Sequence, residues 1–129
     1  MAESLCQLKK KGGGKLKDTV LWTNSTPTSS FNSQTSVLSD SIANYTYIKI
    51  VHRKSTTDGN TTSVYIDPSD FSTNVNARNA IGWLVGSYAY QRTFSYNTDL
   101  KINFNVCYQS GTTTAANQNA IPVSIIGLK

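Results

Sequence analysis

The chain has 129 residues, 38% of them hydrophobic, which is enough for one domain with a real core. Ser, Thr and Asn together supply 44 residues, whereas charged side chains make up only 15%. This composition is unusual for a cytosolic enzyme and suits an extracellular surface of β-strands joined by Thr-rich turns. No apolar run approaches the roughly 20 residues of a membrane helix, so we expect no membrane insertion.

The formal net charge of +5 is concentrated at the start of the chain. Residues 1–17 carry five lysines and one glutamate, a balance of +4, whereas residues 18–129 carry seven basic and six acidic side chains, a balance of +1. Three glycines at positions 12–14 give the first segment a hinge, because glycine has no side chain to pack. We therefore expect an extended N-terminal arm, residues 1–17, followed by one nearly neutral domain, residues 18–129.

Two interpretations of the arm remain open. Leu5 and Leu8 precede the lysine run Lys9, Lys10 and Lys11, a pattern that suits docking on an acidic and partly apolar neighbour or on nucleic acid. The alternative is a frayed, solvated terminus. Docking is favoured because leucine is a poor choice for a segment that stays in water. The nearly neutral domain makes nucleic acid the less favoured partner.

The first half of the domain predicts four strands. The clearest covers residues 45–53, in which Ile48 and Ile50 lie on one face and His52 falls on the same side. The dipeptide Asp58-Gly59 marks the hairpin turn that follows. The predicted strands are residues 18–23, 34–38, 45–53 and 63–67.

The second half contains the most regular pattern of the chain. Five apolar side chains alternate with four polar ones at residues 100–108, which places Cys107 in the polar row. Residues 80–90 are densely apolar, and Gly82 and Gly86 within them indicate bulges or close backbone approach. Residues 92–96 continue a period of two, residues 110–119 form a loop, and residues 121–128 form the last strand.

These strands need a second layer, because a strand that is apolar on one face must be covered on that face. No amphipathic helical pattern supplies the cover, so it must be another sheet. We predict an all-β fold, an antiparallel β-sandwich that is jelly-roll-like with about eight strands, behind the extended arm.

The sequence shows no constellation for catalysis, and we expect no enzyme activity. A nucleophilic site would need His52, the single histidine, as its base, and no Gly-x-Ser-x-Gly turn supports it. Asp67 and Asp70 are close enough in sequence to hold a cation, although an Asp-capped turn explains them and is favoured. A bridge between Cys6 and Cys107 is not required by their spacing. With so few ligands we expect no closed zinc site, and no cofactor is predicted.

Three segments of the domain carry a resemblance to known proteins. They are Thr-Val-Leu-Trp-Thr-Asn-Ser-Thr-Pro-Thr-Ser-Ser-Phe at residues 19–31, Tyr-Thr-Tyr-Ile-Lys-Ile-Val at residues 45–51, and Ala-Ile-Pro-Val-Ser-Ile-Ile-Gly-Leu-Lys at residues 120–129. Together they resemble small virion proteins of tailed bacteriophages and prophage tail-fibre tips, in which such elements recur in a β-sandwich knob. The chain departs from a full tail fibre because only the basic arm, with no long shaft, precedes the domain. The resemblance therefore favours a compact knob attached directly to a larger particle.

The resemblance implies a non-enzymatic virion structural protein that assembles in the bacterial cytoplasm as a homotrimer and binds other virion structural proteins. The expected role is a capsid decoration, a head fibre or a short fibre component. The arm would anchor it to the particle through Leu5, Leu8, Lys9, Lys10 and Lys11.

The alternative role is a tail-tip receptor-binding protein that recognises a host cell-surface glycan or protein. The ligand would then face residues 55–61 and 110–119, with Asp58, Asn60, Thr113 and Asn117 as the candidate contacts. Several aromatic side chains would offer sugar-stacking surfaces, although packing in the core or in an interface is the favoured interpretation. They are Trp22, Trp83, Tyr88, Tyr90 and Tyr96.

Overall fold

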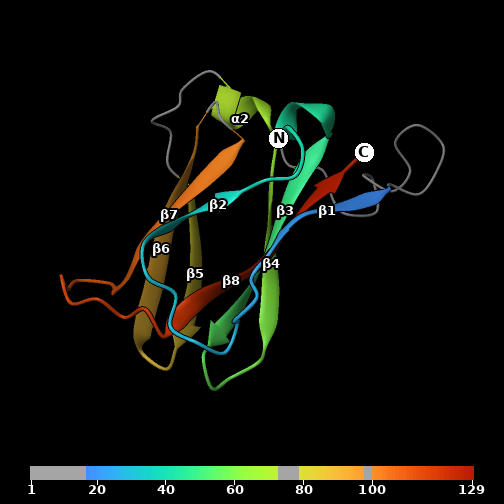
Figure 1. Cartoon of the computed structure of the whole chain (residues 1–129). Coiled ribbons are helices and arrows are strands. Elements are labelled where there is room, and N and C mark those ends of the chain that lie inside the picture. The colour runs from blue at the N-terminus through green and yellow to red at the C-terminus, as the bar shows by residue number, and fades with distance from the viewer. Residues whose placement is uncertain (1–16, 73–78, 98–99) are drawn as a thin grey trace.

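The computed structural model describes residues 17–72, 79–97 and 100–129. In this part of the chain eight β-strands are joined by turns and by two short helical segments (Figure 1). The strands are β1 Asp18–Thr23, β2 Gln34–Val37, β3 Tyr47–Ser55, β4 Thr61–Ile66, β5 Asn79–Val85, β6 Tyr88–Asn97, β7 Lys101–Gln109 and β8 Asn119–Leu128. The helical segments are the 3-10 helix η2 Ile42–Asn44 and the four-residue helix α2 Ser69–Ser72.

The strands form two antiparallel four-stranded sheets. One sheet has the order β1-β8-β3-β4 and the other has the order β2-β7-β6-β5. The chain passes from one sheet to the other between β1 and β2, between β2 and β3, between β4 and β5, and between β7 and β8. This arrangement confirms the predicted antiparallel sandwich of eight strands.

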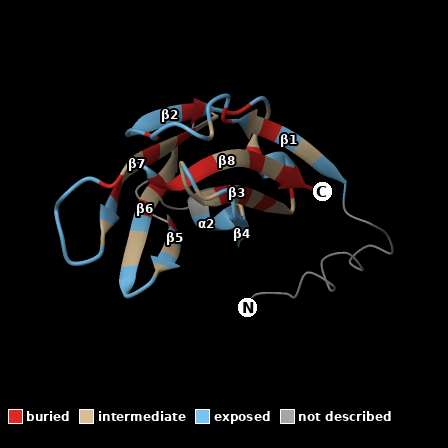
Figure 2. Cartoon of the chain, turned by 90° about the horizontal axis from the view of Figure 1, so that it is seen from below, coloured by how far each residue is buried: buried red, intermediate tan, exposed pale blue. Residues whose placement is uncertain are grey.

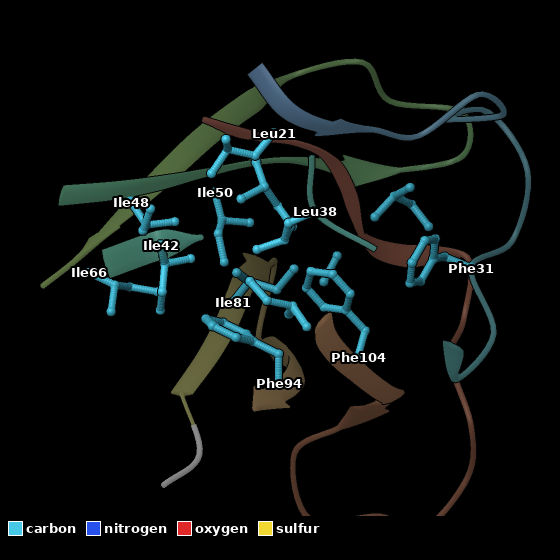
Figure 3. Close-up of a cluster of buried hydrophobic side chains, with 14 of the residues drawn as sticks. Leu21, Phe31, Leu38, Ile42, Ile48, Ile50, Ile66, Ile81, Phe94 and Phe104 are labelled. Atoms are coloured by element: carbon cyan, nitrogen blue, oxygen red, sulfur yellow. The ribbon is translucent and has the colours of Figure 1, made fainter. Parts of the chain in front are cut away.

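The hydrophobic core lies between the two sheets (Figure 3). Ile48 and Ile50 of β3 enter it from one sheet, as their alternation predicted, and Phe94 and Phe104 enter it from the other. The centroids of the two phenylalanine rings are 5.6 Å apart. Burial of each such side chain contributes roughly 1.5–3 kcal/mol to stability, so this layer holds the sheets together.

The apolar stretch at residues 80–90 is a hairpin of two strands. Gly86, at φ +61°, and Ser87 form a two-residue turn, across which Val85 pairs with Tyr88. Such turns favour glycine at the first position because positive φ is strained for other residues. Gly86 is therefore neither a bulge nor a point of close backbone approach, since an added Cβ would have nothing within 4 Å, and the prediction was wrong for this residue. Gly82 does lie close to a backbone group, since an added Cβ would be 3.2 Å from the carbonyl oxygen of residue 90.

The alternation predicted around β7 holds only in the first half of the strand. Phe104 is buried, but the next buried side chain is Cys107, and Tyr108 is 43% exposed. Arg92 lies opposite Cys107 while Phe94 lies opposite Phe104, so three steps along β7 match two steps along β6. The extra residue moves the later side chains to the other face. The prediction that Cys107 belongs to the polar row was wrong for this reason.

The two ends of the sandwich differ in what they carry. At one end the start of β1 lies beside the end of β8, and the backbone N–H of Lys129 donates to the carbonyl oxygen of Lys17 (3.1 Å). The opposite end, which we call the loop end, carries the β1–β2, β3–β4, β5–β6 and β7–β8 connections (Figure 1). Residue 17, where the described chain begins, therefore lies away from the loop end.

Candidate functional site

The loop end is held together by hydrogen bonds between segments that are far apart in the sequence. The backbone N–H of Thr56, in the β3–β4 connection, donates to the carbonyl oxygen of Gln118 (2.9 Å). The backbone N–H of Phe31, in the β1–β2 connection, donates to the carbonyl oxygen of Asn117 (3.0 Å). The β7–β8 loop is thus the common neighbour of the other two connections.

A buried arginine organises this end of the molecule. Arg92 of β6 is 0% exposed, and its Nε donates to the carbonyl oxygen of Ala120 (2.9 Å). Its Nη2 donates to the carbonyl oxygen of Asn119 (3.1 Å), and its Nη1 donates to that of Asn105 (2.8 Å). The guanidinium carbon also lies 5.1 Å from the ring centroid of Phe31. One side chain therefore ties β6 to β7, to the start of β8 and to the β1–β2 connection.

The positive charge of Arg92 is stabilised by the dipoles of backbone carbonyl groups. Within the part of the chain that the structure describes, no carboxylate forms an ion pair with Arg92. Burial lowers the pKa of Arg92 to about 10, so the guanidinium still carries its charge at neutral pH. Sequence reasoning did not single out this residue, although Arg92 shares its strand face with Phe94 and Tyr96, and that shared face was the available signal.

The thiol of Cys107, opposite Arg92 in the sheet, is made unreactive by its surroundings. Cys107 is a free and fully buried cysteine. Burial raises the pKa of the Cys107 thiol, and the nearby Arg92 charge offsets this only in part. Only the deprotonated thiolate is nucleophilic, and the raised pKa keeps Cys107 in the neutral thiol form. Cys107 therefore has a packing role. Its suggested partner Cys6 lies outside the described residues.

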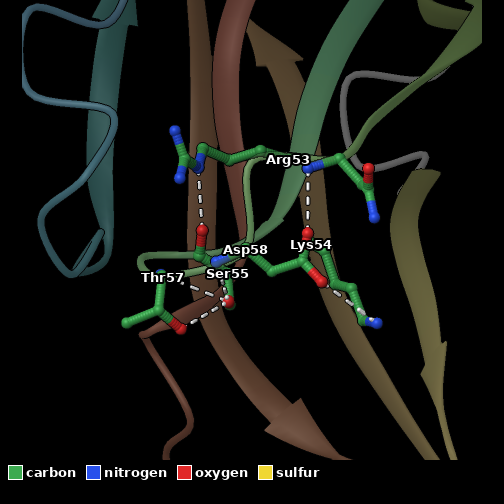
Figure 4. A network of polar contacts seen from close by, with 6 residues as sticks. Arg53, Lys54, Ser55, Thr57 and Asp58 are labelled. Carbon is green, nitrogen blue, oxygen red and sulfur yellow. Dashed lines mark hydrogen bonds and ion pairs between the residues drawn. The ribbon is translucent and has the colours of Figure 1, made fainter.

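Asp58 and Asn60, which were predicted to face a ligand, belong to a tightly bonded turn, in which Figure 4 shows Asp58 beside Ser55 and Lys54. Oδ1 of Asp58 accepts the backbone N–H of Asn60 (3.0 Å), and Oδ2 lies 3.3 Å from Nζ of Lys54. The hydroxyl of Ser55 accepts the backbone N–H of Asp58 (2.9 Å). The N–H of Asn60 is the largest of the contacts that hold the pKa of Asp58 below its usual value. Asp58 thus shapes the turn, whereas Asn60 is exposed.

The other two predicted contacts lie in the β7–β8 loop. Thr113 is exposed near the tip of this loop, which Figure 2 shows projecting from the sandwich. Oδ1 of Asn117 accepts the backbone N–H of Cys107 (3.1 Å), and its Nδ2 donates to Oδ1 of Asn32 (3.1 Å). The side chain of Asn117 therefore fastens the loop. Contact with a ligand at these positions stays a prediction.

A shallow hollow of about 260 Å³ lies at the base of the β7–β8 loop. The β7 irregularity turns Tyr108 outward into this hollow, beside the exposed Gln91 of β6. The lining carries no charged group and consists of Gln91, Thr93, Val106, Tyr108, Gln109, Ser110, Gly111 and Thr112. An aromatic ring next to uncharged amides and hydroxyls suits a neutral sugar. Sequence reasoning missed Tyr108 because the pattern placed it in the apolar row.

Most of the aromatic side chains that were considered for sugar stacking have a packing role. Trp22, Trp83, Tyr90 and Tyr96 pack against the core cluster. Tyr88, which is 54% exposed, differs from them. The packing interpretation is confirmed for the first four.

The single histidine, His52, is buried inside the sandwich. His52 is 1% exposed, and its Nδ1 accepts the indole N–H of Trp83 (2.8 Å). Since Nδ1 accepts, the neutral ring carries its proton on Nε2, which has no hydrogen-bond partner in the described structure. Burial lowers the pKa of His52 to about 4. His52 is therefore a neutral packing residue that joins β3 to β5.

Acid should destabilise the protein through His52. The pKa of this side chain is about 4 when folded and 6.5 when unfolded, so the unfolded state binds more protons between these values. The free energy of unfolding is therefore greatest above pH 6.5 and falls as pH drops toward 4, by at most about 1.4 kcal/mol per pH unit. Urea unfolding across this range measures the slope. His52→Gln should flatten it, and an equal slope in that variant would rule His52 out as its source.

Asp67, which was considered with Asp70 as a cation site, belongs to a capped turn. The backbone N–H and the hydroxyl of Ser69 both donate to Oδ1 of Asp67 (2.9 Å each), as in the favoured capped turn. Among residues 17–72, 79–97 and 100–129, no group of three or more His, Cys, Asp or Glu side chains is placed to hold a metal ion. The same residues contain no helix long and apolar enough to cross a membrane.

The predicted anchoring residues Leu5, Leu8, Lys9, Lys10 and Lys11 lie outside the described residues. No protein-family model, curated protein or solved structure matches the chain.

Proposed function

We propose that the chain is a non-enzymatic virion structural protein, a β-sandwich knob that residues 1–17 attach to a larger particle as a capsid decoration, a head fibre or a short fibre component. The observation that carries this proposal is the separation of the two ends of the sandwich. Residue 17 lies beside the C-terminal Lys129, and the loop end lies opposite. An anchored arm would leave the loop end pointing away from the particle.

The distribution of charge supports the same arrangement. The arm holds a balance of +4 within 17 residues, and the domain holds +1 in the remaining 112. A basic segment with leucines fits an acidic, partly apolar site between subunits of other virion structural proteins. The nearly neutral domain would then remain outside, where its rigidly bonded loops meet the surroundings.

A truncation tests the anchoring role. A chain that lacks residues 1–14 should be incorporated into particles at least about tenfold less than the full chain, because the apolar and basic contacts are lost together. Its unfolding midpoint should be unchanged, since the domain begins at Asp18. Quantification of the chain in purified particles gives the result. Thr113→Ala, at the exposed loop, is the matched control and should be incorporated normally.

Normal incorporation of the truncated chain would contradict the proposal. Loss of incorporation together with a lowered unfolding midpoint would assign the arm to the fold instead. Localisation of the incorporated chain on the head shell favours decoration, and localisation at the tail tip favours the second function below.

A second function, recognition of a host glycan, is favoured by one observation. The hollow beside Tyr108 joins an exposed ring to uncharged amide and hydroxyl groups, next to the β7–β8 loop that projects from the sandwich (Figure 2). Direct binding of the full-length protein to neutral glycans, weakened by Tyr108→Ala, would favour this function over decoration alone.

A further inference from the structure

Among the residues that the structure describes, β5 is the edge strand with the fewest features that disfavour pairing. The four edge strands are β1, β4, β2 and β5, and β2 is only four residues long. Strand β1 carries Asp18 and an irregular register. Strand β4 is regular, but three of its six residues are the polar Thr61, Thr62 and Ser63, and its aromatic residue Tyr65 is 41% exposed. Strand β5, Asn79–Val85, has no charged residue, no proline and no irregularity in its pairing, and its Leu84 is 77% exposed. An apolar, regular and exposed edge is a template for pairing with another strand.

The outer face of β5 carries both a projecting side chain and a hollow. Across to β6, Gly82 lies opposite Gln91 and Leu84 lies opposite Ala89. Because Ala80, Gly82 and Ala89 are small, a hollow of about 410 Å³ remains there beside the exposed Leu84. Ala80, Gly82 and Leu84 share one face of the strand because side chains alternate.

These features are complementary when two copies of β5 lie antiparallel. Gly82 is the middle residue of Asn79–Val85, so pairing over the full strand places Leu84 opposite Ala80 of the second copy, and the reverse. Side chains directly opposite one another have Cβ atoms about 4.5–5.5 Å apart, so each Leu84 would cover the hollow of the other copy. No like charges meet across this twofold axis, because β5 has none.

We propose that β5 is a homodimerisation edge, through which two copies join their β2-β7-β6-β5 sheets into one continuous antiparallel sheet. The partner is a second copy of this chain. This inference goes beyond the proposed function and does not depend on it. It also differs from the homotrimer implied by the resemblance, because a twofold edge pairing closes with two copies.

The mass of the full-length protein in solution tests the proposal. Sedimentation equilibrium should give twice the chain mass of 14.1 kDa. Leu84→Lys should raise the dissociation constant of the dimer at least about tenfold, because the apolar contact with the hollow is lost and a lysine on an edge strand disfavours pairing. Val37→Lys is the matched control, since Val37 is 62% exposed on β2, at the other edge of the same sheet. A monomer or trimer mass for the unaltered chain, or an undisturbed dimer of Leu84→Lys, would overturn the proposal.

Paired cysteines test the register independently. In a Cys6→Ser background, Ala80→Cys combined with Leu84→Cys should give a covalent dimer on oxidation. Opposite Cα atoms in an antiparallel pair are about 4.5–5.5 Å apart, which lies within the range of a disulfide. Either single cysteine should give little cross-linking, because it would face a residue without a thiol. Equal cross-linking by a single variant, or none by the double variant, would overturn the register and the proposal with it.

Discussion

Replacement of Arg92 by methionine is expected to lower the free energy of unfolding by about 3–5 kcal/mol. Methionine keeps an unbranched apolar stem but has no N–H donor. The carbonyl oxygens of Asn119 and Ala120 would then remain buried without this partner, and the partly buried carbonyl oxygen of Asn105 would lose it too. Each such group costs about 1–3 kcal/mol, and relaxation of the β7–β8 loop recovers part of the sum. Urea unfolding at neutral pH measures the change.

Two further variants separate the causes. Arg92→Lys keeps the charge but replaces the planar fork of donors with a single ammonium group, so most of the loss should remain. Arg53→Met is the matched control, because Arg53 is partly exposed and its Nε donates to the carbonyl oxygen of Ser55 (2.8 Å) in a surface turn. Its loss should be about 1 kcal/mol. Equal losses for Arg92→Met and Arg53→Met would contradict the organising role of Arg92.

A methyl group at Gly127 is expected to destabilise the protein by about 3 kcal/mol. An ideal Cβ at this position of β8 would lie 2.6 Å from Cγ and Cε1 of Tyr45. The ring cannot easily move away, because Tyr45 is 8% exposed and its hydroxyl donates to Oδ2 of Asp40 (2.9 Å). Gly127 cannot move either, since it pairs with both β1 and β3. Urea unfolding of Gly127→Ala measures the loss.

A double-mutant cycle assigns this loss to the ring. In a Tyr45→Ala background the same Gly127→Ala change should cost less than about 1 kcal/mol, which gives a coupling of about 2 kcal/mol. Gly59→Ala is a suitable control, because its nearest atom would be 3.7 Å away and little change is expected. An equal cost for Gly127→Ala with and without the ring of Tyr45 would show that the clash is not the cause.

Side-chain periodicity predicted the elements that are regular over their length. The strand predicted at residues 18–23 matches β1, and the strand predicted at residues 45–53 lies two residues from the bounds of β3. The inward positions of Ile48, Ile50 and His52 follow from the period of two alone. Which side chains of a strand are buried depends on the alternation within that strand, so the sequence of the strand alone can predict it.

The parts that periodicity could not predict depend on non-local geometry. The irregularity between β6 and β7 adds one residue without a characteristic side chain, and this moved both Cys107 and Tyr108 to the opposite face. The partners of Arg92 are main-chain carbonyls, which every residue has, so no motif marks them. The turn at Asp58-Gly59 was predicted from its dipeptide, whereas the direction of each loop side chain was not.

The use of main-chain acceptors by Arg92 has a consequence for how the protein can diverge. A guanidinium that binds backbone oxygens is indifferent to the side chains of the segment it holds. Residues 112–115 are exposed and take no part in these bonds, so their side chains can be replaced while the segment keeps its position. Gly111, at φ +81°, is the exception in this loop, because positive φ is strained for other residues. Arg92 thus holds the β7–β8 loop in place whatever side chains the loop exposes. Binding surfaces whose contacts must change in evolution need such a support.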